Sequence, residues 1–238
     1  MTADDRRTAL DRLAAEVVDC RRCDRLVAWR EQVAIERRAA FRDETYWGRP
    51  VTGFGDPDAA VVVVGLAPAA HGANRTGRVF TGDRSGDVLF ASLWRTGFAD
   101  LPTSTARDDG QQLRDAWITM PVRCAPPGNA PTPAERDACE PFLRRELALL
   151  PRVRVVVALG AFGYAAVARL TDVERPRPRF AHGLEVAARF DGRPVTLLCS
   201  FHVSQQNTFT GRLTPAMLDD VFRRARTVAG LRPVRREP

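Results

Sequence analysis

The alternation of apolar and polar positions along the chain predicts four buried strands that alternate with helices. Continuous apolar runs, which are typical of strands covered on both faces, occupy residues 60–64, 117–122, 153–159 and 196–199. Apolar residues at helical spacing begin near residues 2, 85, 133, 160 and 215, before the first run and after each of the four runs. We therefore expect an α/β fold with a mainly parallel four-stranded sheet that is covered on both faces.

Local signals refine these boundaries. Ser85 is expected to cap the second helix, and the capping-box pattern of residues 132–135 predicts the start of the third. Pro141 is expected to kink or restart that third helix, because proline cannot donate a backbone hydrogen bond. Residues 24–58 carry mixed charges and many turn-forming residues, so that they predict a long irregular segment.

The chain has 238 residues, 45% of them hydrophobic and 27% charged, which excludes a disordered, collagen-like or coiled-coil protein. We expect a single domain over residues 1–230 and a basic tail over residues 231–238. The longest apolar stretch, residues 59–70, has twelve residues, whereas a membrane-spanning helix needs about 20. The N-terminal residues lack the pattern of a secretory signal. We therefore expect no membrane partner and a cytoplasmic location.

The positive charge is unevenly distributed. All 36 cationic residues are arginines, and the formal net charge is +7. The last sixteen residues hold six arginines and one acid, a net charge of +5, which leaves +2 for the other 222 residues. This balance permits a nucleic-acid partner but is weak support for one.

Three loops leave the predicted carboxyl ends of strands, which is where α/β sheets bind ligands. They are residues 66–84, 123–131 and 201–212, and they contain His71 and His202, two of the three histidines. His202 lies just after a strand and beside several amides, which favours a functional role. His182 precedes a predicted hairpin, and we expect it to be structural. The glycines of the first loop match neither a P-loop nor a dinucleotide fingerprint, so that no nucleotide cofactor is expected.

Four cysteines indicate a metal centre. Cys20 and Cys23 form a Cys-x-x-Cys pair, and Cys124 and Cys139 flank the region after the second strand. Four thiolates suit either zinc or an iron–sulfur cluster, and a disulfide framework is not expected in a cytoplasmic protein of this size. The wide spacing of the second pair and the neighbouring arginines favour the cluster over zinc without excluding zinc. Cys199 lies inside an apolar strand and is expected to be a buried small hydrophobe.

Several of these segments resemble one known family. The first loop reads GLAPAAHGANRTGR over residues 65–78 and FTGD over residues 80–83, the second contains CAPPGN over residues 124–129, and the third reads HVSQQNTFTGR over residues 202–212. Together with the Cys20–Cys23 pair, they resemble the motifs of the family-five (type b) uracil-DNA glycosylases. The resemblance covers about residues 15 to 225.

The resemblance implies a three-layer α/β/α fold and a 4Fe–4S cluster on Cys20, Cys23, Cys124 and Cys139. It also implies a monofunctional enzyme of base excision repair that extrudes uracil from DNA and hydrolyses the N-glycosidic bond, leaving an abasic site. Phe80 matches the aromatic residue that stacks on the base. His202 matches the histidine that stabilises the charge developing on the base oxygen. The further residues expected to bind substrate are Leu66, Ala67, Met120, Gln206, Asn207 and Arg212.

Some positions differ between this chain and related glycosylases. The first motif has no carboxylate after Leu66 to orient water, which leaves Asn74 or Asp83 as candidates. Met120 stands where several relatives have a base-reading asparagine, so that we expect tolerance of other deaminated bases such as hypoxanthine. Val203 replaces the proline that commonly follows the motif histidine.

The expected partner is double-stranded or single-stranded DNA that contains deaminated bases, bound by a monomeric bacterial protein that works at the nucleoid. Arginines around the first motif, Arg75, Arg78 and Arg84, are expected to contribute to DNA binding. The alternative hypothesis is a non-catalytic iron–sulfur protein that binds nucleic acid.

Overall fold

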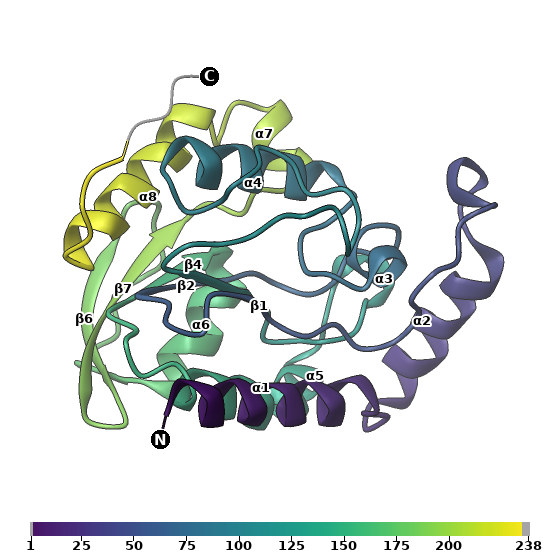
Figure 1. The fold of residues 1–238 in the computed structure, drawn as a ribbon, viewed down its shortest axis with the longest axis horizontal. Coiled ribbons are helices and arrows are strands. Elements are labelled where there is room, and N and C mark those ends of the chain that lie inside the picture. The colour runs from purple at the N-terminus through teal and green to yellow at the C-terminus, as the bar shows by residue number, and fades with distance from the viewer. Residues whose placement is uncertain (1, 235–238) are drawn as a thin grey trace.

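A mixed sheet lies at the centre of the computed structural model, which describes residues 2–234 (Figure 1). Its strands follow the order β1-β3-β2-β4-β7-β6-β5. Four of them are parallel neighbours and correspond to the predicted apolar runs: β3 (Ala116–Thr119), β2 (Val61–Val64), β4 (Val155–Leu159) and β7 (Arg193–Ser200). The predicted parallel core of the sheet is therefore confirmed.

The sheet has seven strands, so that the prediction of four was wrong in number. The three others pair antiparallel at the two edges: β1 (Phe54–Gly55) on one side, and β6 (Glu185–Phe190) with β5 (Asp172–Val173) on the other. Strands β1 and β5 have two residues each, which is too short for a periodic signal. Exposed and buried residues alternate along β6, so that it lacks a continuous apolar run.

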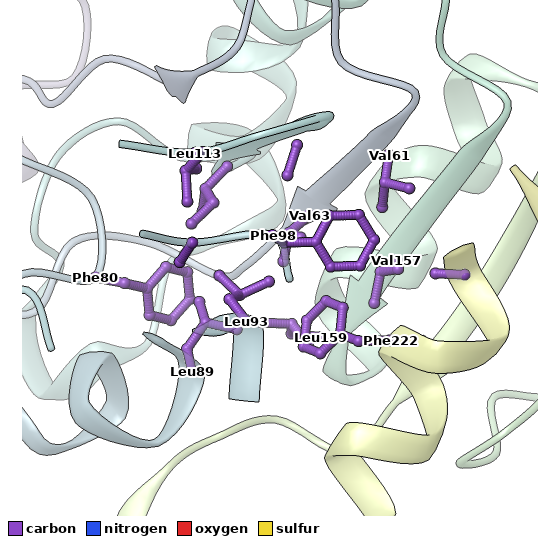
Figure 2. Packing of buried hydrophobic residues seen from close by; sticks show 14 of the residues in the cluster. Val61, Val63, Phe80, Leu89, Leu93, Phe98, Leu113, Val157, Leu159 and Phe222 are labelled. Carbon is purple, nitrogen blue, oxygen red and sulfur yellow. The ribbon is translucent and has the colours of Figure 1, made fainter. Parts of the chain in front are cut away.

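Helices cover both faces of the sheet in a three-layer α/β/α arrangement, as expected (Figure 1). On one face, α4 (Arg84–Arg95) and α8 (Pro215–Val228) pack Leu89, Phe90, Leu93 and Phe222 against Val61, Val63 and Val157 (Figure 2). On the other face, α1 (Ala3–Val18), α5 (Pro133–Ala148) and α6 (Gly160–Leu170) contribute to a second core cluster with the alternate residues Val62, Val64 and Val156. Successive valines of one strand thus serve opposite faces.

Several local predictions need correction. Asp83, not Ser85, caps α4, because its Oδ1 accepts the backbone N–H of Gly86 at 3.0 Å. Helix α5 continues through Pro141, although its capping box at Thr132 and Glu135 is present as predicted.

The segment 24–58 is not irregular throughout. It contains α2 (Asp24–Glu36) and the 3₁₀ helix η1 (Ala39–Phe41), and α2 projects beside the rest of the fold (Figure 1). The buried face of α2 includes Arg30, a charged residue that weakens the apolar periodicity by which helices are predicted.

Three short helices lie in the loops: α3 (Ala73–Thr76), η2 (Pro127–Asn129) and α7 (Gln205–Phe209). Part of the predicted basic tail packs on the fold, since Leu231 contacts the core and the Arg226 guanidinium donates to the carbonyl of Arg232. Residues 235–238 of that tail lie outside the described residues. Within residues 2–234, no helix combines the length and the hydrophobicity needed to cross a membrane.

Candidate active site

The three loops at the carboxyl ends of the parallel strands enclose a cavity of about 700 Å³. Ser85 and Met120 are the two lining residues outside the predicted loop ranges. The full lining is Leu66, Ala67, Pro68, Ala69, Ala73, Phe80, Asp83, Arg84, Ser85, Met120, Gly128, Asn129, His202, Ser204, Gln205, Gln206 and Asn207. The three predicted loops therefore do come together around one cavity at this edge of the sheet.

Phe80 forms one wall of the cavity and is fixed by its backbone as well as by its ring. Its φ of +50° is unusual for a residue other than glycine. A Cβ on Gly65 would lie 2.7 Å from the Phe80 ring, and one on Gly86 would lie 2.0 Å from the Phe80 carbonyl oxygen. Two glycines thus let the chain approach Phe80 closely, and the side chain is buried among core residues (Figure 2).

His202 faces Phe80 across the cavity. The centroids of the two rings are 6.3 Å apart with an interplanar angle of 37°. The Asn207 amide donates a 2.8 Å hydrogen bond to the His202 carbonyl, which ties α7 to the end of β7. Burial lowers the pKa of His202 to about 4. The imidazole is therefore neutral at pH 7, with one ring nitrogen that can donate and one that can accept.

Asp83 brings a carboxylate to the cavity. While Oδ1 caps α4, Oδ2 lies against Gly72, where an added Cβ would be 1.9 Å away. Burial raises the pKa of Asp83, and hydrogen bonds from the backbone of Gly86 and Ser85 partly oppose that shift. A carboxylate with a raised pKa accepts a proton more readily than an exposed one.

Two predicted site residues lie outside the cavity lining. Asn74 is buried in α3, and its Nδ2 donates to the carbonyl of Arg30 on α2 at 3.2 Å. The Arg212 guanidinium lies over the Phe201 ring, 4.5 Å from its centroid. The other eight non-cysteine site residues, namely Leu66, Ala67, Phe80, Asp83, Met120, His202, Gln206 and Asn207, line the cavity together.

The remaining histidines have local partners. Nδ1 of His71 lies 3.1 Å from the Tyr46 hydroxyl, and His71 does not line the cavity. Nδ1 of His182 accepts the backbone N–H of Phe201 at 3.2 Å, and its ring stacks on Phe201. This contact fits the structural role expected for His182.

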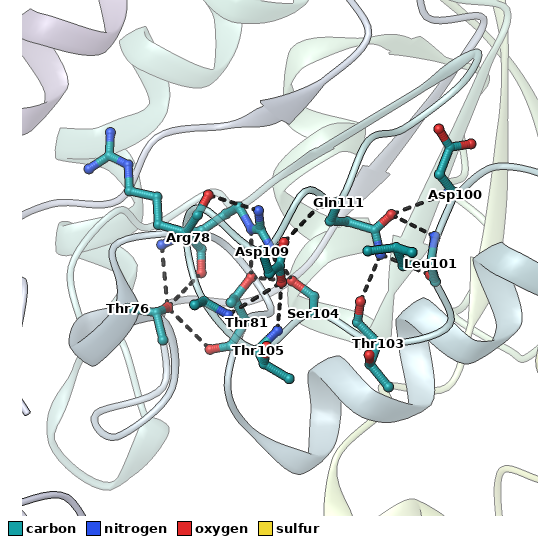
Figure 3. A network of polar contacts seen from close by, with 12 residues as sticks. Thr76, Arg78, Thr81, Asp100, Leu101, Thr103, Ser104, Thr105, Asp109 and Gln111 are labelled. Atoms are coloured by element: carbon teal, nitrogen blue, oxygen red, sulfur yellow. Dashed lines mark hydrogen bonds and ion pairs between the residues drawn. The ribbon is translucent and has the colours of Figure 1, made fainter.

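The expected DNA-contact role of Arg75 and Arg78 is not supported, because both are buried. Arg75 pairs with Glu44 and lies over the Phe41 ring. Arg78 pairs with Asp109 at 2.6 Å and also donates to side chains of the network in Figure 3, Thr81 and Ser104. By contrast, Arg84 is exposed and lines the cavity.

Sequence reasoning assigned no site role to three polar residues of the lining: Ser85, Asn129 and Ser204. Asn129 follows Gly128, and both have positive φ angles, 55° and 60°. Asn129 and Ser204 lie inside the predicted loops, so that their position after strand ends was the signal that could have identified them.

The four predicted metal ligands come from the junction of α1 and α2, the loop after β3, and α5. Cys23 and Cys124 pack in one small apolar cluster with Leu26 and Val122. Burial raises the pKa of Cys124 to about 12, and the charges of Cys139 and Cys20 add to that rise. Cys23 and Cys124, which are far apart in sequence, therefore lie near one another.

Arginines surround these thiols. Nη1 of the buried Arg30 lies 3.2 Å from the Cys124 sulfur. Burial raises the pKa of the Cys139 thiol, and the Arg123 backbone and guanidinium oppose this rise. Within the described chain, no group of three or more His, Cys, Asp or Glu side chains could hold a metal ion as placed. Four thiols beside cationic groups suit the larger, negatively charged iron–sulfur cluster.

Comparison with known proteins connects these features to one family. The profile of the uracil DNA glycosylase superfamily matches residues 52–226. A type-5 uracil-DNA glycosylase of Mycobacterium leprae is 56% identical over 225 residues, which cover 94% of this chain and 97% of that protein. Those of Mycobacterium bovis and Thermus thermophilus are 53% and 50% identical, over 92% and 89% of this chain and 81% and 94% of theirs.

Proposed function

Because the chain belongs to the type-5 family of the uracil-DNA glycosylase superfamily, we propose that it excises uracil from DNA by hydrolysing the N-glycosidic bond. The observation that carries this proposal is the cavity with Phe80 on one wall and His202 on the other. An extruded base stacks on the Phe80 ring, and its carbonyl oxygen approaches His202. The product is an abasic site, and the protein belongs to base excision repair.

His202 acts as a hydrogen-bond donor in this reaction. As the N-glycosidic bond breaks, its electron pair moves onto the base, and negative charge grows on the carbonyl oxygen. A placed N–H donor in a site shielded from water stabilises that charge and is typically worth roughly 3–4 kcal/mol. Since burial holds the pKa of His202 at about 4, the donor is a neutral imidazole rather than an imidazolium.

Asp83 is the better candidate for orienting water. Water adds to the anomeric carbon of the sugar, and the proton that it loses passes to a carboxylate. Asp83 lines the cavity, whereas the buried Asn74 does not, and its amide donates to the carbonyl of Arg30. The first motif thus obtains a carboxylate from its C-terminal end rather than from the residues after Gly65.

The pocket is permissive toward the base. Met120, which is 1% exposed, closes it with an apolar side chain that cannot read hydrogen-bonding groups. Leu66 and Ala67 add further apolar surface. We therefore extend the proposed substrates to other deaminated bases, such as hypoxanthine, in double-stranded and single-stranded DNA.

Cys20, Cys23, Cys124 and Cys139 hold a 4Fe–4S cluster in this proposal. When bound, the cluster supplies cross-links between the N-terminal helices, the loop after β3, and α5, rather than a reacting atom. Arg30 and Arg123 offset the charge of the thiolates. Purified protein is expected to be brown with about four irons per chain, the number that this cluster type requires. Cys139→Ala should lose the iron, whereas Cys199→Ala should retain it. Stoichiometric zinc in folded, colourless protein would refute the assignment.

The protein works as a monomer at the bacterial nucleoid in this account. The decisive assay uses a labelled duplex with a single U·G pair, incubated with the protein and then treated with alkali. Strand scission at the uracil is the expected result. A blank result from protein that binds the duplex would instead support the non-catalytic alternative.

A further inference from the structure

Three arginines alternate with prolines in the loop between β5 and β6, which we call the arginine loop (residues 174–180). Arg175, Arg177 and Arg179 are all exposed. None of the three forms an ion pair with any residue between 2 and 234. The nearest acid in the sequence is Glu174, at the start of the loop. Three like charges so close in sequence repel one another unless an anionic partner compensates them.

The arginine loop is held in place at the cavity edge of the sheet. The Tyr164 hydroxyl, in the first turns of α6, donates to the carbonyl of Pro178 at 3.0 Å. The Phe180 ring contacts the rings of Tyr164 and Phe201, with centroids 6.3 Å away in both pairs. Pro176 and Pro178 restrict the backbone further, which lowers the entropy cost of holding the arginines at a binding surface.

Phe201 connects this loop to the proposed active site. It immediately precedes His202, and its backbone N–H donates to His182 just beyond the loop. The Arg212 guanidinium lies over the Phe201 ring, 4.5 Å from the centroid. Arg212, which does not line the cavity, and the arginine loop therefore both contact Phe201, Arg212 through its guanidinium and the loop through the Phe180 ring.

We propose that Arg175, Arg177 and Arg179 bind the phosphates of the DNA strand that carries the extruded base, on the β6 side of the cavity. The three residues span at most about 14 Å of chain, and each DNA strand presents one phosphate per 3.4 Å of helix axis. Guanidinium groups match phosphate oxygens in geometry as well as in charge. The inference rests on the proposed function for its choice of DNA as the partner.

The test measures the affinity for an undamaged duplex at several salt concentrations, with Arg175→Ala, Arg177→Ala and Arg179→Ala combined. Each lost phosphate contact lowers the slope of log K against log salt by about 0.9. We expect the slope to fall by about 2–3, while melting temperature stays near that of the parent. The corresponding triple lysine variant should retain most of the slope, because it keeps the charges.

The matched control combines Arg7→Ala, Arg12→Ala and Arg152→Ala. These arginines are also exposed and free of ion pairs with the described residues, but they lie on α1 and before the start of β4, away from the cavity edge. An equal fall in slope in both triple variants, or a fall below about 0.5 in the loop variant, would overturn the proposal.

Two further arms separate this inference from the proposed function. The salt slope for binding to single-stranded DNA should also fall in the loop variant, by about 0.7 per lost contact. A fall confined to the duplex would overturn the assignment to the base-carrying strand.

Excision at saturating protein should stay within about threefold of the parent, because the cavity is intact. If the parent excised nothing while the loop variant lost slope, the proposed function would fail and the phosphate contact would stand.

Discussion

The two walls of the cavity are built differently. The wall that carries Phe80 belongs to the core: Ala73, Val79 and Phe80 are all buried, and the intervening Arg78 is enclosed by Asp109 and Ser104. The wall that carries His202 is more exposed in the segment that follows the histidine. It buries Val203 and Leu213, but Gln205, Gln206 and Thr210 are exposed, and Phe209 is 72% exposed.

This difference separates two tasks. The buried wall presents an aromatic surface whose position is set by core packing and by close-fitting glycines, and it therefore defines the shape of the pocket. In the proposed mechanism, the exposed wall supplies the hydrogen-bond donor and the surface that meets DNA. The arginines follow the same division, because Arg75 and Arg78 maintain the first wall while Arg212 and the arginine loop remain exposed beside the second.

The largest expected effect is on the buried wall. In Gly86→Ala, the new Cβ would lie 2.0 Å from the Phe80 carbonyl oxygen, and both the backbone of Phe80 and the helix α4 would have to shift. Overpacking of this kind costs about 1–3 kcal/mol and sometimes more. We expect a clearly lower melting temperature and loss of excision.

Gly192→Ala is the control for this change. Gly192, unlike Gly86, has a positive φ, 77°, and no atom lies within 4 Å of the added Cβ. It should lose a little stability through backbone strain and retain excision. Equal effects of the two substitutions would show that the fit around Phe80 does not matter.

The next largest effect concerns the donor on the exposed wall. His202→Ala should lower the single-turnover rate on a U·G duplex by roughly a hundredfold or more, as expected when one transition-state donor is removed. DNA affinity and melting temperature should change little, because the side chain faces the cavity. A rate within threefold of the parent would refute the role of His202.

A smaller effect should distinguish the two candidates for orienting water. Asp83→Asn keeps a side chain that caps helices well but removes the proton acceptor, so that we expect at least a tenfold loss of rate. Asn74→Ala should alter stability more than rate, because Asn74 bonds to Arg30 and does not line the cavity. A larger loss of rate in Asn74→Ala than in Asp83→Asn would assign the orientation of the water to Asn74 instead.

Much of the fold was predictable from the sequence because its central strands are unusually uniform. Val61 to Val64 are fully buried, and such runs signal parallel strands without further context. Helix α2 was missed because the buried Arg30 breaks its apolar pattern. The Arg30 guanidinium contacts the Cys124 sulfur instead of solvent, which no local pattern in the sequence indicates. The edge strands β1 and β5 depend on pairing with neighbours that are distant in sequence.

The location of the cavity was likewise predictable, but the environment of its side chains was not. The order of strands and loops placed Phe80 and His202 together. Whether an arginine is buried depends on partners far along the chain, as for Arg78 and Asp109, and no local pattern indicates them. Asn74 and Asp83 show the same limit. They are only nine residues apart, yet Asp83 lines the cavity and Asn74 does not.

The division of tasks requires that His202 works as a neutral donor. Burial lowers its pKa from 6.5 to about 4 in the folded protein. Between these values the unfolded chain binds a proton that the folded protein does not, so that His202 lowers stability as pH falls from 6.5 toward 4. Above pH 5, the folded protein keeps the imidazole neutral.

The most direct test is therefore the single-turnover rate of the parent on a U·G duplex between pH 5 and pH 8, divided by the rate of His202→Ala at each pH. We expect a ratio that is large and flat over this range, because the donor has the same protonation state throughout. A ratio that rises as pH falls, with a midpoint near 6.5, would show that the donor is an imidazolium and would contradict the assignment of His202 as a neutral donor.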